Sequence, residues 1–251
     1  METKKVGTKI LLYDIETMSN LAYVWGKYEQ NVISYEKEWY MLSFAYKWLG
    51  EKQTHVLSLP DFKGYTKNKT NDKALVAELW KLFDEADIVI AHNGNSFDQK
   101  KANAKFVEHG MKPPSPYKQI DTKLVARRYF NFNSNKLDDL ARLFGFGRKL
   151  DTGGFDTWLG CASGDMKAWR KMCFYNKHDV VLLEKIYLKM RGWMTNHPHV
   201  GVLSDDKEVC PNCNAKALQK RGFGIRGNLT KVQRFQCTAC GGWTQKTIPK
   251  K

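Results

Sequence analysis

The first three quarters of the chain alternate between short apolar runs and helical patterns. Residues 9–13 form an apolar run that ends at Asp14 and predicts a buried strand. Residues 41–48 and 55–59 predict two more strands, which the turn signal between them favours as an antiparallel pair. Apolar residues then recur at helical spacing from 72 to 86, with Asp72 as the expected N-cap.

The pattern continues with strands and helices in alternation. It predicts short strands at 87–91 and through Ile120, and helices at 97–109, 123–130, 136–144 and 166–194. The stretch 151–165 is rich in glycine and aromatic residues and is typical of an active-site loop. Three initial strands followed by this alternation predict a mixed α/β sheet with helices on both faces.

The last quarter of the chain has a different composition. A helix-breaking, polar segment at 197–208 predicts a linker between a main domain at 1–196 and a small module at 209–251. The module holds nine Lys or Arg and no acid, so it contributes +9 to the formal net charge of +15 of the whole chain. Such a charge favours nucleic acid as the partner, and a membrane surface is the weaker interpretation.

Three groups of polar residues are candidates for chemistry in the main domain. Asp14 and Glu16 are two apart on the first strand, so their carboxylates lie on the same side of the backbone. Asp98 lies between a buried strand and the next helix, where a loop can approach the same crevice. Tyr175 and Asp179 share one face of the long helix, and Asp179 precedes buried aliphatic positions, so a metal ion would provide the charge partner it needs.

Taken in order, these segments resemble the DEDD exonuclease superfamily, with its ribonuclease-H-like fold. The similarity lies in D-I-E-T at 14–17, H-N-x-x-x-F-D at 92–98 and Y-x-x-x-D at 175–179. Phe174 occupies the position of the general base in the histidine subtype, so the resemblance is to the tyrosine subtype. Further stretches at 121–122, 126–128 and 134–137 look like those of family B DNA polymerase exonuclease domains and their stand-alone, often phage-encoded relatives.

The resemblance implies a mixed five-stranded sheet and a two-metal mechanism. Two Mg²⁺ or Mn²⁺ ions would lie ~3.5–4 Å apart and stabilise the attacking and leaving oxygens of a phosphodiester. By analogy Asp14 would touch both ions, Glu16 and Asp179 would hold the first, and Asp98 would hold the second directly or through water. Tyr175 orients the attacking water, since its ordinary pKa near ~10 makes it a poor base by itself.

Contacts with the substrate are assigned by position in the same motifs. Thr17, Asn93 and Phe97 are candidates for holding the terminal nucleotide, with Phe97 either stacking on a base or packing in the core. Trp158, together with Phe155, is either a wall for single-stranded nucleic acid or an anchor of its loop. His92 is more typical of a structural histidine than of a magnesium ligand.

Four of the six cysteines form two C-x-x-C pairs in the C-terminal module. Each pair, Cys210 with Cys213 and Cys237 with Cys240, is a knuckle that offers two thiolates to one tetrahedral ion. A structural Zn²⁺ is the favoured ligand, and disulfides or a rubredoxin-like iron site are the competing interpretations. The module resembles zinc ribbons, and its interspersed basic and aromatic residues suit phosphate contact with base stacking.

These observations predict a metal-dependent 3′-5′ exonuclease, with a zinc ribbon that strengthens binding. The expected substrate is nucleic acid, single-stranded or at a 3′ end, and the resemblance favours DNA over RNA. Any proofreading would serve a separate polymerase or another replication or repair protein. No targeting or membrane-spanning pattern is visible, so we expect a cytoplasmic protein, in the host cytoplasm if phage-encoded. A structure-specific endonuclease or ribonuclease and a non-catalytic nucleic-acid-binding adaptor are the alternatives.

Overall fold

A five-stranded mixed sheet forms the centre of the protein, in a computed structural model that describes residues 7–28, 31–202 and 208–248. Its strand order is β5-β4-β1-β6-β7, in which β1, β6 and β7 run parallel and β4 and β5 pair antiparallel. The strands span Ile10–Thr17 (β1), Met41–Trp48 (β4), His55–Ser58 (β5), Ile88–Ala91 (β6) and Lys118–Asp121 (β7). The predicted mixed five-stranded sheet is confirmed.

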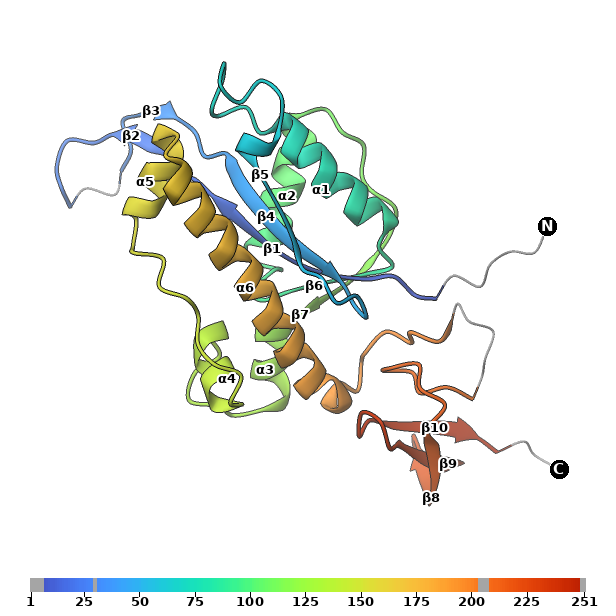
Figure 1. Cartoon of the computed structure of the whole chain (residues 1–251). Coiled ribbons are helices and arrows are strands. Elements are labelled where there is room, and N and C mark those ends of the chain that lie inside the picture. The colour runs from blue at the N-terminus through green and yellow to red at the C-terminus, as the bar shows by residue number, and fades with distance from the viewer. Residues whose placement is uncertain (1–6, 29–30, 203–207, 249–251) are drawn as a thin grey trace, which may run out of the picture.

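Helices cover both faces of this sheet, as predicted (Figure 1). Alternate residues of β1 pack into the hydrophobic cores on the two sides of the sheet, because successive side chains along a strand point to opposite faces. Leu11 and Tyr13 pack with α1 and α2, whereas Leu12 packs with α3, α4 and the second half of α6. The helices span Lys73–Glu85 (α1), Asp98–Glu108 (α2), Thr122–Tyr129 (α3), Leu137–Leu143 (α4) and Met166–Met190 (α6).

Asp72 precedes α1 as predicted, but its side chain does not cap the helix. The buried carboxylate instead accepts hydrogen bonds from Met41 N at 2.8 Å and from His109 Nε2 at 2.7 Å. A buried carboxylate needs such partners, and these two lie on neighbouring elements rather than on α1 itself. Asp72 is therefore the N-cap residue by position, as predicted, but its carboxylate joins β4, α1 and α2 instead of capping α1.

The glycine-rich stretch 151–165 is not a loop throughout. It contains the helix α5 (Asp156–Ser163), which ends at Gly164 with a left-handed φ of 96°. Gly164 thus acts as a helix C-cap, a position that favours glycine. The long helix α6 follows directly, and a short 3₁₀ turn, η2 (Arg191–Trp193), continues it almost to the predicted end.

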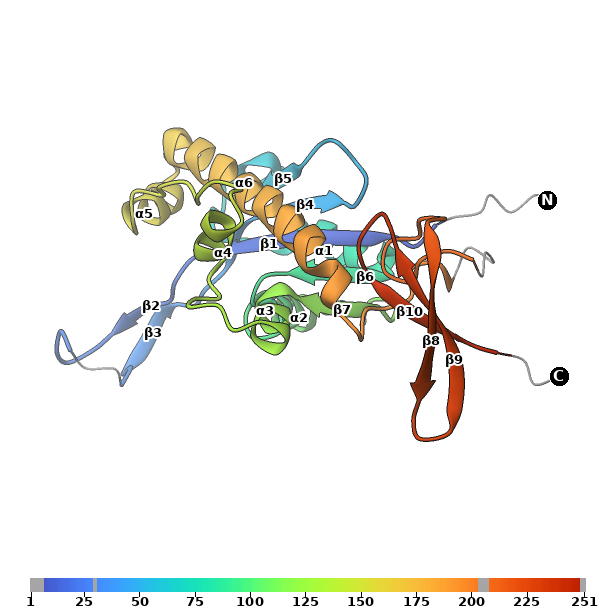
Figure 2. The same ribbon diagram turned by 90° about the horizontal axis from the view of Figure 1, so that it is seen from below.

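A two-stranded hairpin that the hydrophobic pattern did not predict leaves the sheet after β1. It consists of β2 (Leu21–Tyr23) and β3 (Ser34–Lys37), and it extends away from the main body (Figure 2). Its side chains are largely solvent-exposed, including those of Trp25 and Tyr28. Without a buried face, the segment has no periodicity from which a strand could be recognised.

A three-stranded antiparallel sheet forms the C-terminal module beside the end of α6 (Figure 2). Asn212 Nδ2 donates to Arg191 O at 3.1 Å, and a Cβ added to Gly192 would lie 2.3 Å from the carbonyl oxygen of Cys240. The module is therefore in close contact with η2. Its strands are β8 (Leu218–Arg226), β9 (Thr230–Cys237) and β10 (Trp243–Thr247), in the order β10-β9-β8.

Part of the predicted linker packs against the main body. Val200 is buried with the core around α6, and its carbonyl accepts a hydrogen bond from Thr8 Oγ1 at 2.5 Å. Residues 203–207 of the linker, like the first six residues and the last three, lie outside the described residues. In the described part of the chain, no helix combines the length and apolarity needed to cross a bilayer.

Candidate active site

Three carboxylates converge where β1 passes beneath the middle of α6. Asp14, Glu16 and Asp179 each place a carboxylate oxygen so that the three atoms lie within 4.8 Å of one another. Asp14 and Glu16 reach this point because two-residue spacing on β1 directs both to the α6 side of the sheet. Asp179 is buried, and its Oδ1 has no hydrogen-bond partner. Hard divalent cations bind oxygen ligands of this kind.

Asp98 lies beside this group, at the first residue of α2. Its Oδ1 accepts a hydrogen bond from Ile15 N at 3.1 Å, which ties it to the backbone between Asp14 and Glu16. The side chain is only 3% exposed. The approach of Asp98 to β1, expected from the strand–loop–helix pattern, is therefore present, although Asp98 is not part of the set within 4.8 Å.

Burial raises the pKa of all four acids, and repulsion within the group adds to the effect for Asp14 and Glu16. Burial raises the pKa of Glu16 to about 8, with repulsion from Asp179 adding to the effect. Burial likewise raises the pKa of Asp98 to about 7, against the opposing effect of its hydrogen bond from Ile15. Burial and repulsion from Asp98 and Glu16 hold the pKa of Asp14 well above its usual range. Such a group favours either bound protons or a cation, which is a property of metal sites and of catalytic carboxylates.

Lys149 partly neutralises this cluster, and sequence reasoning missed it. Its Nζ lies 2.7 Å from Asp179 Oδ2 and donates a hydrogen bond of 3.0 Å to Tyr175 OH. Burial lowers the pKa of Lys149, but attraction to Asp179 and Tyr175 outweighs burial and raises the pKa overall. Lys149 lies in a loop without periodicity, so only its proximity to the motif residues reveals it.

Asn176 and Ser43 hold Asp14 in place, and they too were missed. The fully buried amide of Asn176 donates to Asp14 Oδ2 at 2.7 Å and to Asp14 O at 3.2 Å. Ser43 Oγ on β4 donates in turn to Asn176 Oδ1 at 3.0 Å. Asn176 is adjacent to Tyr175 in the third motif, but a sequence does not show which side of the helix pairs with β1.

Asp121 shapes the loop at 92–98. Its carboxylate accepts hydrogen bonds from Asn93 N at 2.9 Å and Asn95 N at 3.1 Å, and it also caps α3. Asn93 adopts a left-handed φ of 68°, and its Oδ1 accepts a hydrogen bond from Lys123 Nζ. Asn93 is thus bound within its own loop, and Asp98 is placed at the end of that loop.

His92 is a structural histidine, as its sequence context suggested. Its ring nitrogens contact Thr122 Oγ1 at 2.9 Å and Asn135 O at 3.0 Å. Burial lowers the pKa of His92 to about 4, so the ring is neutral near pH 7.

Phe97 is 39% exposed and is therefore not a core residue. Its ring faces solvent next to Asp98, at a position from which it can stack on a base. Thr17 ends β1 at an irregularity in the pairing with β4, just beyond Glu16. Both residues adjoin metal-site candidates, as their motif positions required.

Tyr175 lies next to the acids on α6, and Trp158 on α5 packs edge-on against its ring with centroids 6.5 Å apart. Trp158 is therefore an anchor between helices and borders the site through Tyr175. Burial, together with repulsion from Asp179 and Glu16, raises the pKa of Tyr175. The phenol thus keeps its proton, which suits an orienting role rather than that of a base. His178 binds Arg148 O at 2.9 Å, outside the cluster.

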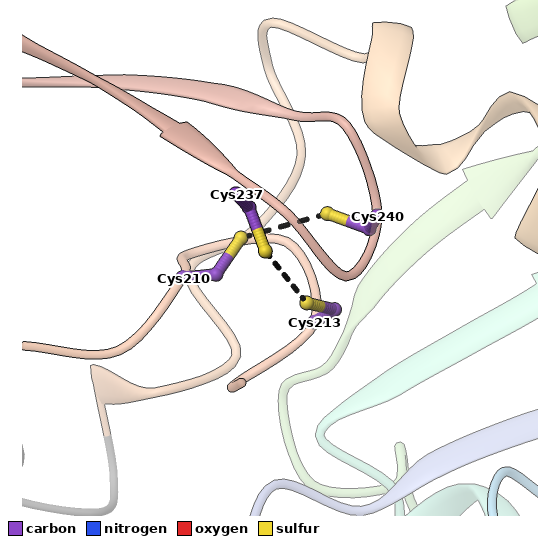
Figure 3. Close-up of side chains that lie close together, drawn as sticks. All are labelled: Cys210, Cys213, Cys237 and Cys240. Atoms are coloured by element: carbon purple, nitrogen blue, oxygen red, sulfur yellow. Dashed lines mark hydrogen bonds between the residues drawn. The ribbon is translucent and has the colours of Figure 1, made fainter. Parts of the chain in front are cut away.

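The four cysteines of the module converge on one point (Figure 3). Cys210 Sγ lies 3.6 Å from Cys240 Sγ, and Cys213 Sγ lies 3.7 Å from Cys237 Sγ. Four thiolates around a tetrahedral zinc with Zn–S bonds near 2.3 Å have sulfurs ~3.8 Å apart, so the spacing fits zinc. All four thiols are free, at distances too long for disulfides.

Comparisons with known proteins agree with the fold of the main domain. A sequence profile described as RNase_H superfamily (RNase_H_2) matches residues 28–191. Among solved structures, the chain is similar to the family B DNA polymerase from the hyperthermophilic archaeon Pyrobaculum calidifontis, with a TM-score of 0.51 and 13% identity. The match covers 74% of this chain but only 25% of the polymerase chain, so the similarity is to the fold of one part of the polymerase. No curated protein matches the sequence significantly.

Proposed function

The chain belongs to the RNase H superfamily, and we propose that it is a metal-dependent exonuclease that removes nucleotides from the 3′ ends of DNA. The observation that carries this proposal is the convergence of Asp14, Glu16 and Asp179 within 4.8 Å, with Asp98 bonded to the same strand. The likeness to a family B DNA polymerase supports it, because the exonuclease part of such an enzyme fits the matched fold and size.

The acidic residues suit divalent cations by their chemistry. All the donors are carboxylates, and burial raises their pKa values, with mutual repulsion adding to the effect for Asp14 and Glu16. Asp179 Oδ1 is buried without a partner. Asp14, Glu16 and Asp179 would hold one Mg²⁺ or Mn²⁺, and Asp14 with Asp98 a second. Bound there, the ions would acidify a water molecule and neutralise charge on the phosphodiester.

The protein's own residues then orient the reactants. Tyr175 keeps its proton and lies beside Asp179, so it would direct a water molecule toward the phosphorus, a role that supports the proposed tyrosine subtype. Lys149 holds its charge between Asp179 and Tyr175 and would pair with the phosphate that enters the site. Asn176 fixes the carboxylate of Asp14 through its 2.7 Å hydrogen bond.

The terminal nucleotide would lie over the loop at 92–98. Phe97 offers an exposed ring for stacking, and Thr17 lies at the end of β1 beside Glu16. Asn93 has its side-chain oxygen on Lys123, so it would contact the nucleotide through other atoms or support the loop. Trp158 would act indirectly, by bracing Tyr175.

The C-terminal module would bind one structural zinc through Cys210, Cys213, Cys237 and Cys240. A module of this size has little core, so the ion would contribute much of its folding free energy. We propose that it forms a second folding unit at about 209–251, which adds to nucleic-acid affinity.

The polarity of degradation tests the proposed function. A 5′-labelled single-stranded oligonucleotide with Mg²⁺ should give a ladder of products that shorten from the 3′ end, whereas a closed single-stranded circle should stay intact. Cutting of the circle would identify an endonuclease, and faster degradation of RNA would identify a ribonuclease. Binding without any cleavage, under Mg²⁺ and Mn²⁺ alike, would favour the adaptor.

A further inference from the structure

One face of the C-terminal sheet carries alternating cations and rings. Lys231, Gln233 and Phe235 are two apart on β9 and share a face, because side chains alternate along a strand. Residues directly opposite in antiparallel pairs lie on the same side, which adds Ile225 and Phe223 from β8. Lys220 from β8 and Lys246 from β10 complete this surface, which we call the ribbon face.

Contacts between side chains confirm that these groups form one surface. Lys231 Nζ lies 4.3 Å from the ring centroid of Phe223, and Lys246 Nζ lies 5.3 Å from that of Phe235. Phe223 is 54% exposed, and a hollow of about 380 Å³ opens beside it toward Lys231 and Leu229.

The chemistry of the ribbon face matches a single strand of nucleic acid. Exposed rings stack on unpaired bases, and lysines between them contact the phosphates. No Asp or Glu occurs anywhere from 209 to 251, so no carboxylate within the module repels a polyanion. An apolar protein partner would instead meet lysines that it cannot pair.

The distance between the ribbon face and the acids determines how long a strand must be to reach both sites. The last turn of α6 lies roughly 17 Å along the helix axis from Asp179, at 1.5 Å per residue. From Cys237, β9 extends roughly 20 Å further to Lys231, at ~3.3 Å per residue. If the angle between these paths is at least about 65°, the two sites are roughly 20 to 37 Å apart, which corresponds to about 6 to 11 stacked nucleotides at ~3.4 Å each.

We propose that the ribbon face grips the 5′ part of the single strand whose 3′ end lies among the carboxylates. The gripping of a strand rests on the geometry of the module alone, whereas its link to trimming rests on the proposed function. The ribbon face then acts on strands that span both sites and has no effect on shorter ones.

The affinity for a single strand, measured without divalent cations, tests whether the ribbon face binds the strand separately from catalysis. The double variant Phe223→Ala with Lys231→Ala should weaken binding of a ~20-nucleotide single strand at least ~10-fold, since each stacked base and phosphate contact contributes. The matched control, Trp243→Ala with Arg226→Ala, also removes one ring and one cation, but from the opposite face, and should change affinity less than ~2-fold. Equal losses in both double variants, or no loss in the first, would overturn the grip.

Strand length tests the span. The first double variant should degrade a strand of ~4 nucleotides at the wild-type rate, and wild-type degradation of the long strand should slow once about 6 to 11 nucleotides remain. An equal defect on both lengths would overturn the span. If binding follows these expectations but no strand is degraded, the grip stands and the proposed function fails; the converse result leaves the exonuclease and removes the grip.

Discussion

Replacing Asn176 by Ala tests whether the site depends on a fixed orientation of Asp14. The substitution removes the hydrogen bonds of 2.7 Å and 3.2 Å to Asp14 and leaves Ser43 Oγ without its acceptor. A hydrogen bond to a charged group contributes ~1.5–3 kcal/mol, and loss of a partner that orients a metal ligand typically costs ~10–100-fold in metal affinity. We therefore expect the Mg²⁺ concentration for half-maximal activity to rise by about that factor.

The assay is a titration of initial degradation rate against Mg²⁺ at saturating oligonucleotide. Ser43→Ala is the matched control, because it removes one hydrogen bond from Asn176 but leaves both bonds to Asp14. It should shift the Mg²⁺ midpoint only a few-fold, within the range for one neutral hydrogen bond of ~0.5–1.5 kcal/mol.

A general loss of packing would give a different result. Unfolding by urea should show Asn176→Ala as moderately destabilised yet fully folded at the assay temperature. If its Mg²⁺ midpoint equals that of the wild-type protein while the maximal rate falls, Asn176 is merely structural and the proposed orientation of Asp14 is refuted.

Three further predictions concern other parts of the molecule. Lys149→Met should slow degradation. Because it removes the cation beside Asp179, it should also destabilise the metal-free protein more than the Mg²⁺-bound protein. Equal destabilisation of both forms in thermal melts would contradict this. Because the folded pKa of Glu16 is raised to about 8, its contribution to stability is present at low pH and lost as pH rises from about 4.5 to 8, by up to ~1.4 kcal/mol per pH unit. Urea titrations without metal should therefore show that Glu16→Gln gains stability over wild type as pH rises, and Mg²⁺ should remove that gain; a difference that does not change with pH would refute the coupling. Gly192→Ala should displace the module, because a Cβ would meet the Cys240 carbonyl at 2.3 Å, and zinc should then be released faster to a chelator; an unchanged release rate would show that this contact does not hold the module.

Much of the central sheet was predictable because its strands are buried on both faces. The strand at 41–48 has the predicted bounds, since it is rich in aliphatic and aromatic residues and the turn signal at 50–52 follows it closely. Asp72 shows the limit of such patterns: its position before α1 was predicted, but its bonding partners come from distant elements. Local sequence does not contain that information.

The candidate site likewise contains some residues that the sequence reveals and others that only the structure reveals. The sequence reveals the four acids because they occur at the spacing of the three motifs, and the structure brings them together: Asp14, Glu16, Asp98 and Asp179. Lys149, Asn176 and Ser43 act through contacts across β1, β4 and α6, and no spacing along the chain reveals those contacts. The helix α5 was missed because it lies in the stretch 151–165, whose glycines and aromatic residues are typical of a loop.

The most direct test of the account is the effect of removing the carboxylates. Asp14→Asn with Glu16→Gln should abolish Mg²⁺-dependent shortening of a 5′-labelled oligonucleotide, while Glu51→Gln at the exposed turn after β4 should leave it unchanged. The doubly substituted protein should remain folded and, freed of repulsion between buried acids, be at least as stable as the wild-type protein without metal. Undiminished shortening by this folded variant would contradict the assignment of the active site.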